Sequence, residues 1–186
     1  MHSKFRLSLT KTTTYSVTIR RMVAYGVDII LLFGGILAEQ FVLRAITGFP
    51  SNEQLHDGQK MEKWTISTIE LPVWAYFVIC EQSAWQATIG KRLLGLHVSD
   101  TSGKPIGFGR AILRTTMKML PWDLTHLSLM LPSPLWLEKK PTFRPGLLVA
   151  NILIVVYLAT MLFTPRKQSI HDLVAGTIVL KRGSYY

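Results

Sequence analysis

Residues 146–164, GLLVANILIVVYLATMLFT, decide the fold, because these nineteen consecutive residues carry no charged side chain. A helix rises about 1.5 Å per residue, so this stretch would be about 28 Å long. That length is close to the hydrocarbon core of a bilayer, which is roughly 30 Å thick. Residues 20–43, RRMVAYGVDIILLFGGILAEQFVL, form a second apolar stretch, interrupted by Asp28. The sequence therefore predicts an integral membrane protein.

The composition agrees with a membrane protein and argues against a nucleic-acid-binding one. Hydrophobic residues make up 48% of the 186-residue chain and charged residues 17%, with 21 Lys and Arg against 11 Asp and Glu. A formal charge of +10 would suit either nucleic acid or an anionic membrane face. The apolar residues come in long blocks, which favours the membrane, so we expect no nucleic-acid partner. Cys80 is the single cysteine, so no disulfide framework is available.

We predict an all-α membrane protein, a small bundle of about four transmembrane helices with a short cytoplasmic hairpin or irregular loop. The third helix starts amphipathic and contains Pro121, Asp123 and His126. It could span the membrane, lie on its surface or form a kinked half-helix. The predicted spans are residues 21–43, 64–81, 111–131 and 146–164. The membrane domain would cover residues 21–180, between a cytoplasmic segment 1–20 and a tail 181–186.

The distribution of Lys and Arg predicts the orientation of the chain. Cytoplasmic loops of membrane proteins are enriched in these two residues. Fifteen of the 21 lie before the first span, in residues 82–118, or after the last span. This places both termini in the cytoplasm, which requires an even number of spans. We expect a multi-pass protein of the cell membrane.

The loop after the second predicted span carries a turn signal and a basic strip. SDTSGKP, residues 99–105, is a turn cluster, and LLGLHV before it could pair as a strand with IVL, residues 178–180. Arg110, Arg114 and Lys118 follow at i, i+4 and i+8, on one face of a helix. That strip suits contact with anionic lipid headgroups. An ordinary positively charged cytoplasmic loop is an equally good account.

Three motifs lie in order along the chain. They are RRMVAYGVD at the first span, SAWQATIGKRLLGLHVSDTSGKPIGFGRAILR after the second, and RKQSIHDLVAGTIVL after the last. Together they resemble the RDD family of small membrane proteins. The resemblance places the family's arginine at Arg21 (Arg20 in the other register) and its two aspartates at Asp28 and Asp172. It implies a transporter of unspecified mechanism.

Asp28 would place a carboxylate inside the bilayer, where an unpaired charge is unfavourable. A charge at the bilayer centre costs about 2.5–3.5 kcal/mol, so the carboxylate must be neutral, hydrogen-bonded or paired. Arg21 lies seven residues earlier, about 10.5 Å along the axis and too far for direct contact. Asp28 is therefore either a proton or cation site, with Glu70 or Asp172 as a second carboxylate, or an acceptor that fixes helix packing.

Two of the other carboxylates have competing interpretations, and a third has one. Glu70 precedes Pro72, which can open a helix and make Glu70 an ion ligand, or it lies in the first turns of a shorter helix. Asp172 is either a gate in transport or the third residue of a short helix capped by Ser169. Glu81 falls near a span end, where we expect an ordinary solvated charge.

Histidines raise the question of a metal or a proton relay. Asp123 and His126 are helical neighbours, and His171 precedes Asp172. No HExxH motif or cysteine cluster accompanies them, so we expect no metal and no other cofactor.

Two functions follow. The first is a proton- or cation-coupled transporter, with Asp28 as the site, Arg21 as its electrostatic control and Asp172 as a gate. Because four short spans are few for a transport pathway, we expect a homo-oligomer. The second is a non-transporting adaptor or assembly factor that binds lipids or partner proteins through its basic cytoplasmic face. Neither a P-loop nor a catalytic triad pattern is present, so we do not expect an enzyme.

Overall fold

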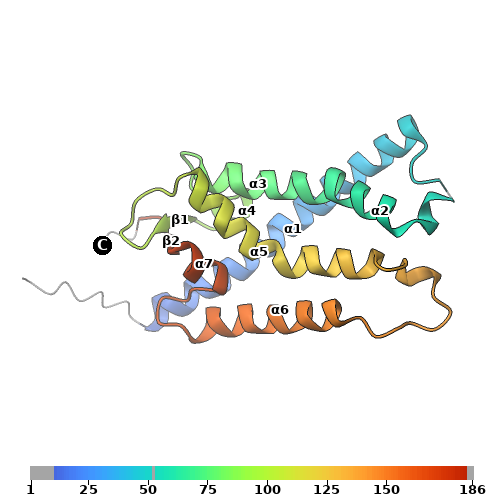
Figure 1. The fold of residues 1–186 in the computed structure, drawn as a ribbon. Helices are drawn as coiled ribbons and strands as arrows, with labels where there is room; N and C mark the ends of the chain where they lie inside the picture. Colours follow the sequence, from blue (N-terminus) through green and yellow to red (C-terminus); the bar gives the residue numbers. More distant parts are fainter. Residues whose placement is uncertain (1–10, 52, 184–186) are drawn as a thin grey trace, which may run out of the picture.

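The computed structural model describes residues 11–51 and 53–183, with side chains from residue 17 onward. The chain is mostly helical, as predicted, and one small sheet lies at one end (Figure 1). In order, its elements are α1 (Lys11–Thr47), η1 (Gln54–His56), α2 (Gly58–Thr65), the π-helical turn η2 (Ile66–Glu70), α3 (Leu71–Gln82), α4 (Ile89–Leu93), β1 (Leu96–Asp100), α5 (Phe108–Met130), η3 (Leu135–Leu137), α6 (Pro145–Phe163), α7 (Ile170–Ala175) and β2 (Thr177–Lys181).

Within the described residues, two helices have the length and apolar composition needed to cross a membrane. They are Val17–Thr47 within α1, and α6. Pro145 begins α6. Its missing N–H costs nothing there, because the N–H groups of the first turn have no acceptor within the helix. The predicted spans 21–43 and 146–164 coincide with these helices. Residues 11–20, predicted as a cytoplasmic segment, belong to α1, while residues 1–10 and 184–186 of the predicted end segments lie outside the described residues.

The second predicted span lies inside one continuous helical segment of 25 residues, formed by α2, η2 and α3. The Asp57 side chain accepts from the Lys60 backbone N–H and so begins the segment. Pro72 lacks a backbone donor and its ring crowds the carbonyl of Thr68, which the wider π turn before it accommodates. Glu70 therefore lies in a helix interior, and the alternative that placed it in a first turn is wrong.

The third predicted span corresponds to α5, a 23-residue helix with Pro121 in its interior. It packs against α3, α6 and α7, and its direction changes along its length (Figure 1). A proline inside a helix removes one hydrogen bond and bends the axis. Helix α5 is therefore a proline-bent helix packed against three other helices of the bundle.

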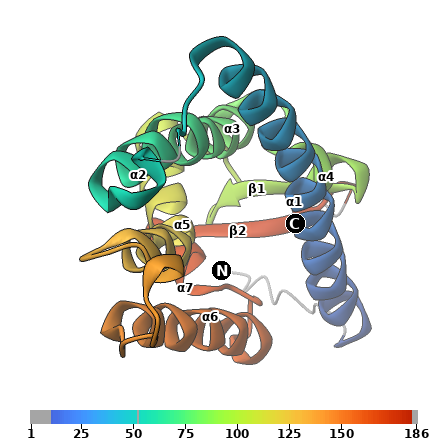
Figure 2. The ribbon, with the colours of Figure 1, turned by 90° about the vertical axis from the view of Figure 1, so that its right-hand side faces the viewer.

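The end of the bundle with β1, β2, α4 and α7 is called the sheet end (Figure 1), and Figure 2 looks along the bundle toward it from the other end. β1 and β2 pair antiparallel with Val98 opposite Val179, which confirms the predicted pairing. Each strand follows a short helix and a glycine with positive φ, Gly95 (+67°) and Gly176 (+60°). A left-handed glycine is a common helix stop, so both turns into the sheet depend on it.

The opposite end, with residues 48–51, 53–57 and 131–144, is called the loop end. The loop between α5 and α6 at this end is anchored by Arg144. The Arg144 guanidinium donates to the carbonyl oxygens of Ser128, Leu131 and Ser133 and to the Glu138 carboxylate. One buried side chain thus holds the loop between α5 and α6.

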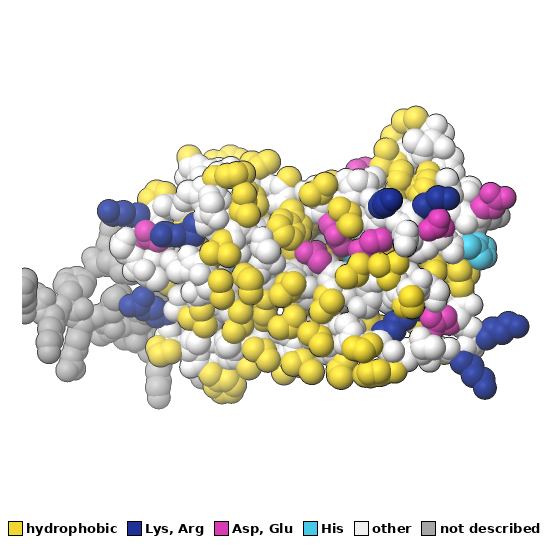
Figure 3. All heavy atoms as spheres, viewed as in Figure 1, with side chains coloured by type: hydrophobic (Ala, Val, Ile, Leu, Met, Phe, Trp, Pro, Cys, Tyr) yellow, Lys and Arg dark blue, Asp and Glu magenta, His cyan; other side chains and the backbone are white. Residues whose placement is uncertain are grey.

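Large apolar side chains are exposed along both candidate spans. On α1 they include Ile30 (73%), Phe41 (77%) and Ile46 (76%), and on α6 Val155 (65%) and Phe163 (83%). Apolar surface dominates the middle of the molecule, and many of the charged side chains on the face in Figure 3 lie toward the two ends. Apolar patches of this extent mark an interaction surface, and an apolar band between two polar ends fits a bilayer.

Candidate functional site

A buried cluster of charged side chains lies at the sheet end, centred on Arg114. Arg114 Nε donates to Glu81 Oε2 at 2.8 Å, and its Nη1 donates to Asp172 Oδ1 and, at 3.0 Å, to Thr177 Oγ1. Glu81 and Asp172 are fully buried, and Arg114 is 1% exposed. One guanidinium therefore joins α3, α5, α7 and β2.

Three further cations complete this cluster. Arg21 on α1 donates through Nη2 to Asp172 Oδ2 at 2.5 Å and through Nη1 to the Lys167 carbonyl. Lys91 and Lys118 donate to Glu81 Oε1 at 2.7 and 2.8 Å. Lys118 also lies 3.9 Å above the Phe77 ring, a cation–π contact. These six residues, Arg21, Glu81, Lys91, Arg114, Lys118 and Asp172, are the ionic network. It holds four cations and two carboxylates.

Asp172 is both a helix cap and a member of the network. Its Oδ2 accepts from the backbone N–H of Ser169 at 3.0 Å, at the start of α7, as the capping interpretation predicted. Burial alone would raise the pKa of this carboxyl, but Arg114 and Arg21 outweigh burial and hold the pKa far below its ordinary value. Asp172 is therefore an anion at physiological pH, and the guanidinium groups fix it in place.

Asp28 lies apart from Arg21 in a shell of neutral donors. Its Oδ1 accepts from the Tyr76 hydroxyl at 2.7 Å and the Gly90 N–H at 2.8 Å, and its Oδ2 accepts from Thr88 Oγ1 at 2.6 Å. The residue is 1% exposed. These three bonds hold α1 against α3 and the start of α4, as the packing interpretation of Asp28 requires.

Gly90 makes this approach possible. A Cβ atom at residue 90 would lie 2.1 Å from the Ala24 carbonyl oxygen and 2.9 Å from Asp28 Oδ1. Only glycine lets the α4 backbone lie directly on α1.

The expected basic strip on α5 is not a strip facing lipid headgroups. Arg110 is exposed and pairs with Asp100 at 3.1 Å, but Arg114 and Lys118 point inward to Glu81. The exposed face of α5 instead carries Ile112, Leu113 and Leu120. In a membrane the apolar face of a helix turns outward and the charged face inward, which reverses the arrangement expected from a soluble helix.

Glu70 does not join Asp28 or Asp172. Its Oε1 lies 3.0 Å from His126 Nδ1, in the loop-end half of the bundle. The predicted ion-site residues thus separate into three places: Arg21 with Asp172, Asp28 with Tyr76 and Thr88, and Glu70 with His126. Asp123 and His126 are likewise far from the His171–Asp172 pair in the fold, so no single relay joins the four.

Sequence reasoning missed Glu81, which was expected to be solvated. Glu81 ends α3 at the sheet end, where three cations from α4 and α5 converge on it. Lys91 and Thr88 were also missed, although both belong to the quoted ATIGKRLLGL motif. One signal was present in that motif: Thr88 stands where a threonine can cap a short helix, and it does cap α4. No local pattern shows that Lys91 would be buried against Glu81.

The apolar exterior and the buried charges are typical of a membrane protein. The chain belongs to the RDD family, whose model matches residues 15–176. No curated protein and no solved structure matched in the corresponding comparisons.

Acid is expected to destabilise the sheet end first through His171. Burial lowers the pKa of His171 well below its ordinary value, and the nearby cations Arg114, Lys118 and Arg21 lower it further against the opposing effect of Asp172. The folded protein keeps this histidine neutral while the unfolded chain binds a proton below about pH 6.5. Stability contributed by His171 is therefore present above about pH 6.5 and falls by up to about 1.4 kcal/mol per pH unit below it.

Thermal unfolding of the detergent-purified protein between about pH 7 and pH 5 checks this expectation. His171→Gln should flatten the pH dependence, whereas His56→Gln, at an exposed histidine of the loop end, should leave it unchanged. An unaltered slope in His171→Gln would show that this histidine does not set the acid sensitivity.

Proposed function

We propose that the chain crosses the membrane four times and exchanges protons or cations across it. The four spans would be α1, the α2–α3 segment, α5 and α6. The α2–α3 segment and α5, at 25 and 23 residues, would be about 37 and 34 Å long, which is enough for a bilayer core. The sheet end would face the cytoplasm, because it carries most of the Lys and Arg.

The observation that carries this proposal is buried charge inside a bundle with an apolar exterior. Ionisable side chains in membrane helices are costly, and they commonly mark ion pathways and proton relays. Here they occur at two levels: the ionic network at the sheet end and the Glu70–His126 pair toward the loop end. A non-transporting adaptor would not need buried ionisable side chains both at the sheet end and toward the loop end.

The ionic network would act as the closure of the sheet end. Arg114 ties Glu81 of α3 to Asp172 of α7, so α7 and the sheet are held against the bundle. A transported cation that reached Glu81 would compete with Lys91 and Lys118 for its Oε1 and loosen this hold. Opening of the sheet end would then depend on the transported species.

Proteoliposomes with an internal pH dye test the proposed exchange. Wild type should dissipate an imposed pH gradient, in the presence of Na⁺ or K⁺, faster than empty liposomes. Asp28→Asn keeps an acceptor for Tyr76 and Gly90 but removes the charge, and we expect flux about tenfold lower, equivalent to about 1.4 kcal/mol of lost binding. Glu53→Gln, at an exposed loop-end carboxylate, is the matched control.

Wild-type flux no faster than that of empty liposomes would contradict the exchanger. Equal flux in wild type and Asp28→Asn would contradict Asp28 as the proton or cation site of the exchanger.

A non-transporting adaptor is the second candidate, and exposed apolar side chains at the sheet end favour it. Leu93 is 69% exposed, Trp85 47% and Leu173 45%. If wild type gives no flux, substitution of Leu93 and Leu173 by Ser should weaken capture of a cytoplasmic partner. Retained capture would remove this candidate.

A further inference from the structure

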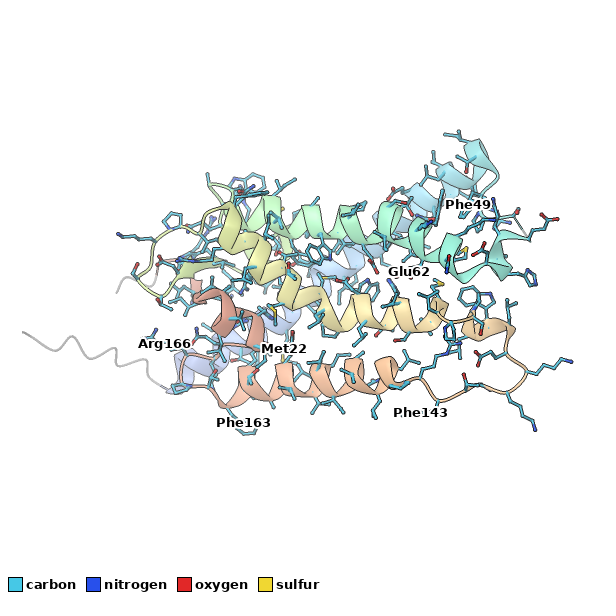
Figure 4. The ribbon with its side chains drawn as sticks, in the orientation of Figure 1. Met22, Phe49, Glu62, Phe143, Phe163 and Arg166 are labelled. Atoms are coloured by element: carbon cyan, nitrogen blue, oxygen red, sulfur yellow. The ribbon has the colours of Figure 1, made fainter. Side chains whose placement is uncertain are left out.

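A second cluster of ionisable side chains, two of them buried and two half-buried, occupies the loop-end half of the bundle. It consists of Glu62 on α2, Glu70 at the end of the π turn, and Asp123 and His126 on α5, and is called the acidic cluster. Glu62 lies between α2 and α5 in Figure 4. Glu62 and Glu70 are only 7% and 8% exposed. These groups come from facing helices that pack against each other.

Only part of this cluster is hydrogen-bonded. His126 Nδ1 lies 3.0 Å from Glu70 Oε1, and Trp74 Nε1 donates to Asp123 Oδ1 at 3.5 Å. Glu62 Oε2 is buried and has no hydrogen-bond partner. A buried, unpartnered carboxylate oxygen carries a large desolvation cost. Protonation removes that cost and turns the oxygen into a donor.

The charges of the acidic cluster are not balanced. It holds three carboxylates, and within the described residues no Lys or Arg forms an ion pair with any of them. His126 is the one group that could supply a positive charge. The facing groups that act electrostatically on Glu62 are Glu70 and His126, and those that act on Asp123 are Glu70, His126 and Glu62. On the side of the π turn that faces α1, the neighbouring side chain is Gln40, which is uncharged and donates a hydrogen bond to Thr68 of that turn.

The contrast with the ionic network identifies the ligand class. There, four cations surround two carboxylates, so both carboxylates can stay ionised. In the acidic cluster three carboxylates share one histidine, so uptake of a positive charge would stabilise it. Among the described residues no group of three His, Cys, Asp or Glu side chains is arranged to hold a metal ion, which favours a proton as that charge.

The backbone at the acidic cluster supports a site rather than a packing accident. Glu70 is placed by the π turn ahead of Pro72, and such turns inside helices are frequent at functional sites. The wider turn brings Glu70 to His126 on the facing helix. A regular α-helical turn would rotate Glu70 away from that position.

We propose that Glu62, Glu70, Asp123 and His126 form a shared proton-binding site in the loop-end half of the bundle. Protons move between the carboxylates and the His126 imidazole as the surrounding pH changes; no bond other than O–H and N–H forms or breaks. The site rests on the proposed function insofar as it supplies the protons that are exchanged, but its protonation is measurable without transport.

Infrared difference spectra of the full chain in nanodiscs, between about pH 8 and pH 5, test the site directly. Wild type should gain a carboxylic-acid C=O band that shifts in D₂O. Glu62→Gln and Glu70→Gln should each lose part of that band, and His126→Gln should shift its midpoint. Glu53→Gln is the matched control and should leave the band as in wild type.

Flux measured on the same preparations separates the two proposals. A band that responds to Glu62→Gln, in a protein without flux, supports the site and contradicts transport. Flux with a band unchanged in both Glu62→Gln and Glu70→Gln overturns the site and leaves transport standing. Gln preserves side-chain size, and a monodisperse elution profile shows that each variant is folded. If a Glu→Gln variant fails to fold, the pH midpoint of the C=O band in His126→Gln tests the site instead. A midpoint equal to that of wild type overturns the site.

Discussion

Arg114→Met should destabilise the folded protein by about 3–5 kcal/mol, because it leaves Glu81 and Asp172 with too few donors inside the bundle. Arg114 is the only residue of the ionic network bonded to both carboxylates within the described part of the chain. Methionine is close in length, so the loss would report the missing charge rather than a cavity. Thermal unfolding of the detergent-purified variant measures it.

Arg110→Met is the matched control, on the same helix one turn earlier. Its side chain is 43% exposed and pairs with Asp100 at the surface. Exposed pairs contribute about 0–1 kcal/mol, so this variant should unfold near wild type. Similar losses for the two variants would contradict the buried role of Arg114.

Gly90→Ala should be the second most damaging small change, with a loss of at least about 3 kcal/mol. The added methyl group would meet the Ala24 carbonyl oxygen, a backbone atom that cannot rotate away. Overpacking costs about 1–3 kcal/mol, and α4 would also lose the Gly90 N–H bond to the Asp28 carboxylate. The same thermal unfolding measures this loss.

Gly26→Ala tests the same chemistry without the contact. Residue 26 lies on α1 two positions before Asp28, and no atom lies within 4 Å of an added Cβ there. Alanine favours a helix over glycine by about 1 kcal/mol, so Gly26→Ala should be neutral or stabilising. A mild effect of Gly90→Ala would mean that α4 does not lie on α1.

Composition and local patterns were enough to predict the two apolar helices, the strand pair and the Ser169–Asp172 cap. Each depends on neighbours along the chain: an uncharged run, alternation around a turn, or a residue at the third helical position. Helix α5 shows the limit of such patterns. Its spacing put Arg110, Arg114 and Lys118 on one face, yet spacing alone does not say whether that face meets water or the bundle interior.

The charge pairings were beyond local patterns because their partners are far apart in sequence. Glu81 meets Arg114 across 33 positions, and Arg21 meets Asp172 across 151. Asp28 and Arg21 share a helix but face different partners: Asp28 accepts from Thr88 and Gly90 at the start of α4, and Arg21 donates to Asp172 of α7. The acidic cluster was divided in the sequence between a proline-flanked Glu70 and a separate Asp123–His126 pair.

Arg21 is paired with Asp172 and not with Asp28. Two double-mutant cycles on unfolding free energy test it most directly: Arg21→Met with Asp172→Asn, and Arg21→Met with Asp28→Asn. The first cycle should give a coupling of about 0.5–3 kcal/mol, and the second should be additive within about 0.5 kcal/mol. Additivity in the first cycle, or coupling confined to the second, would contradict the account.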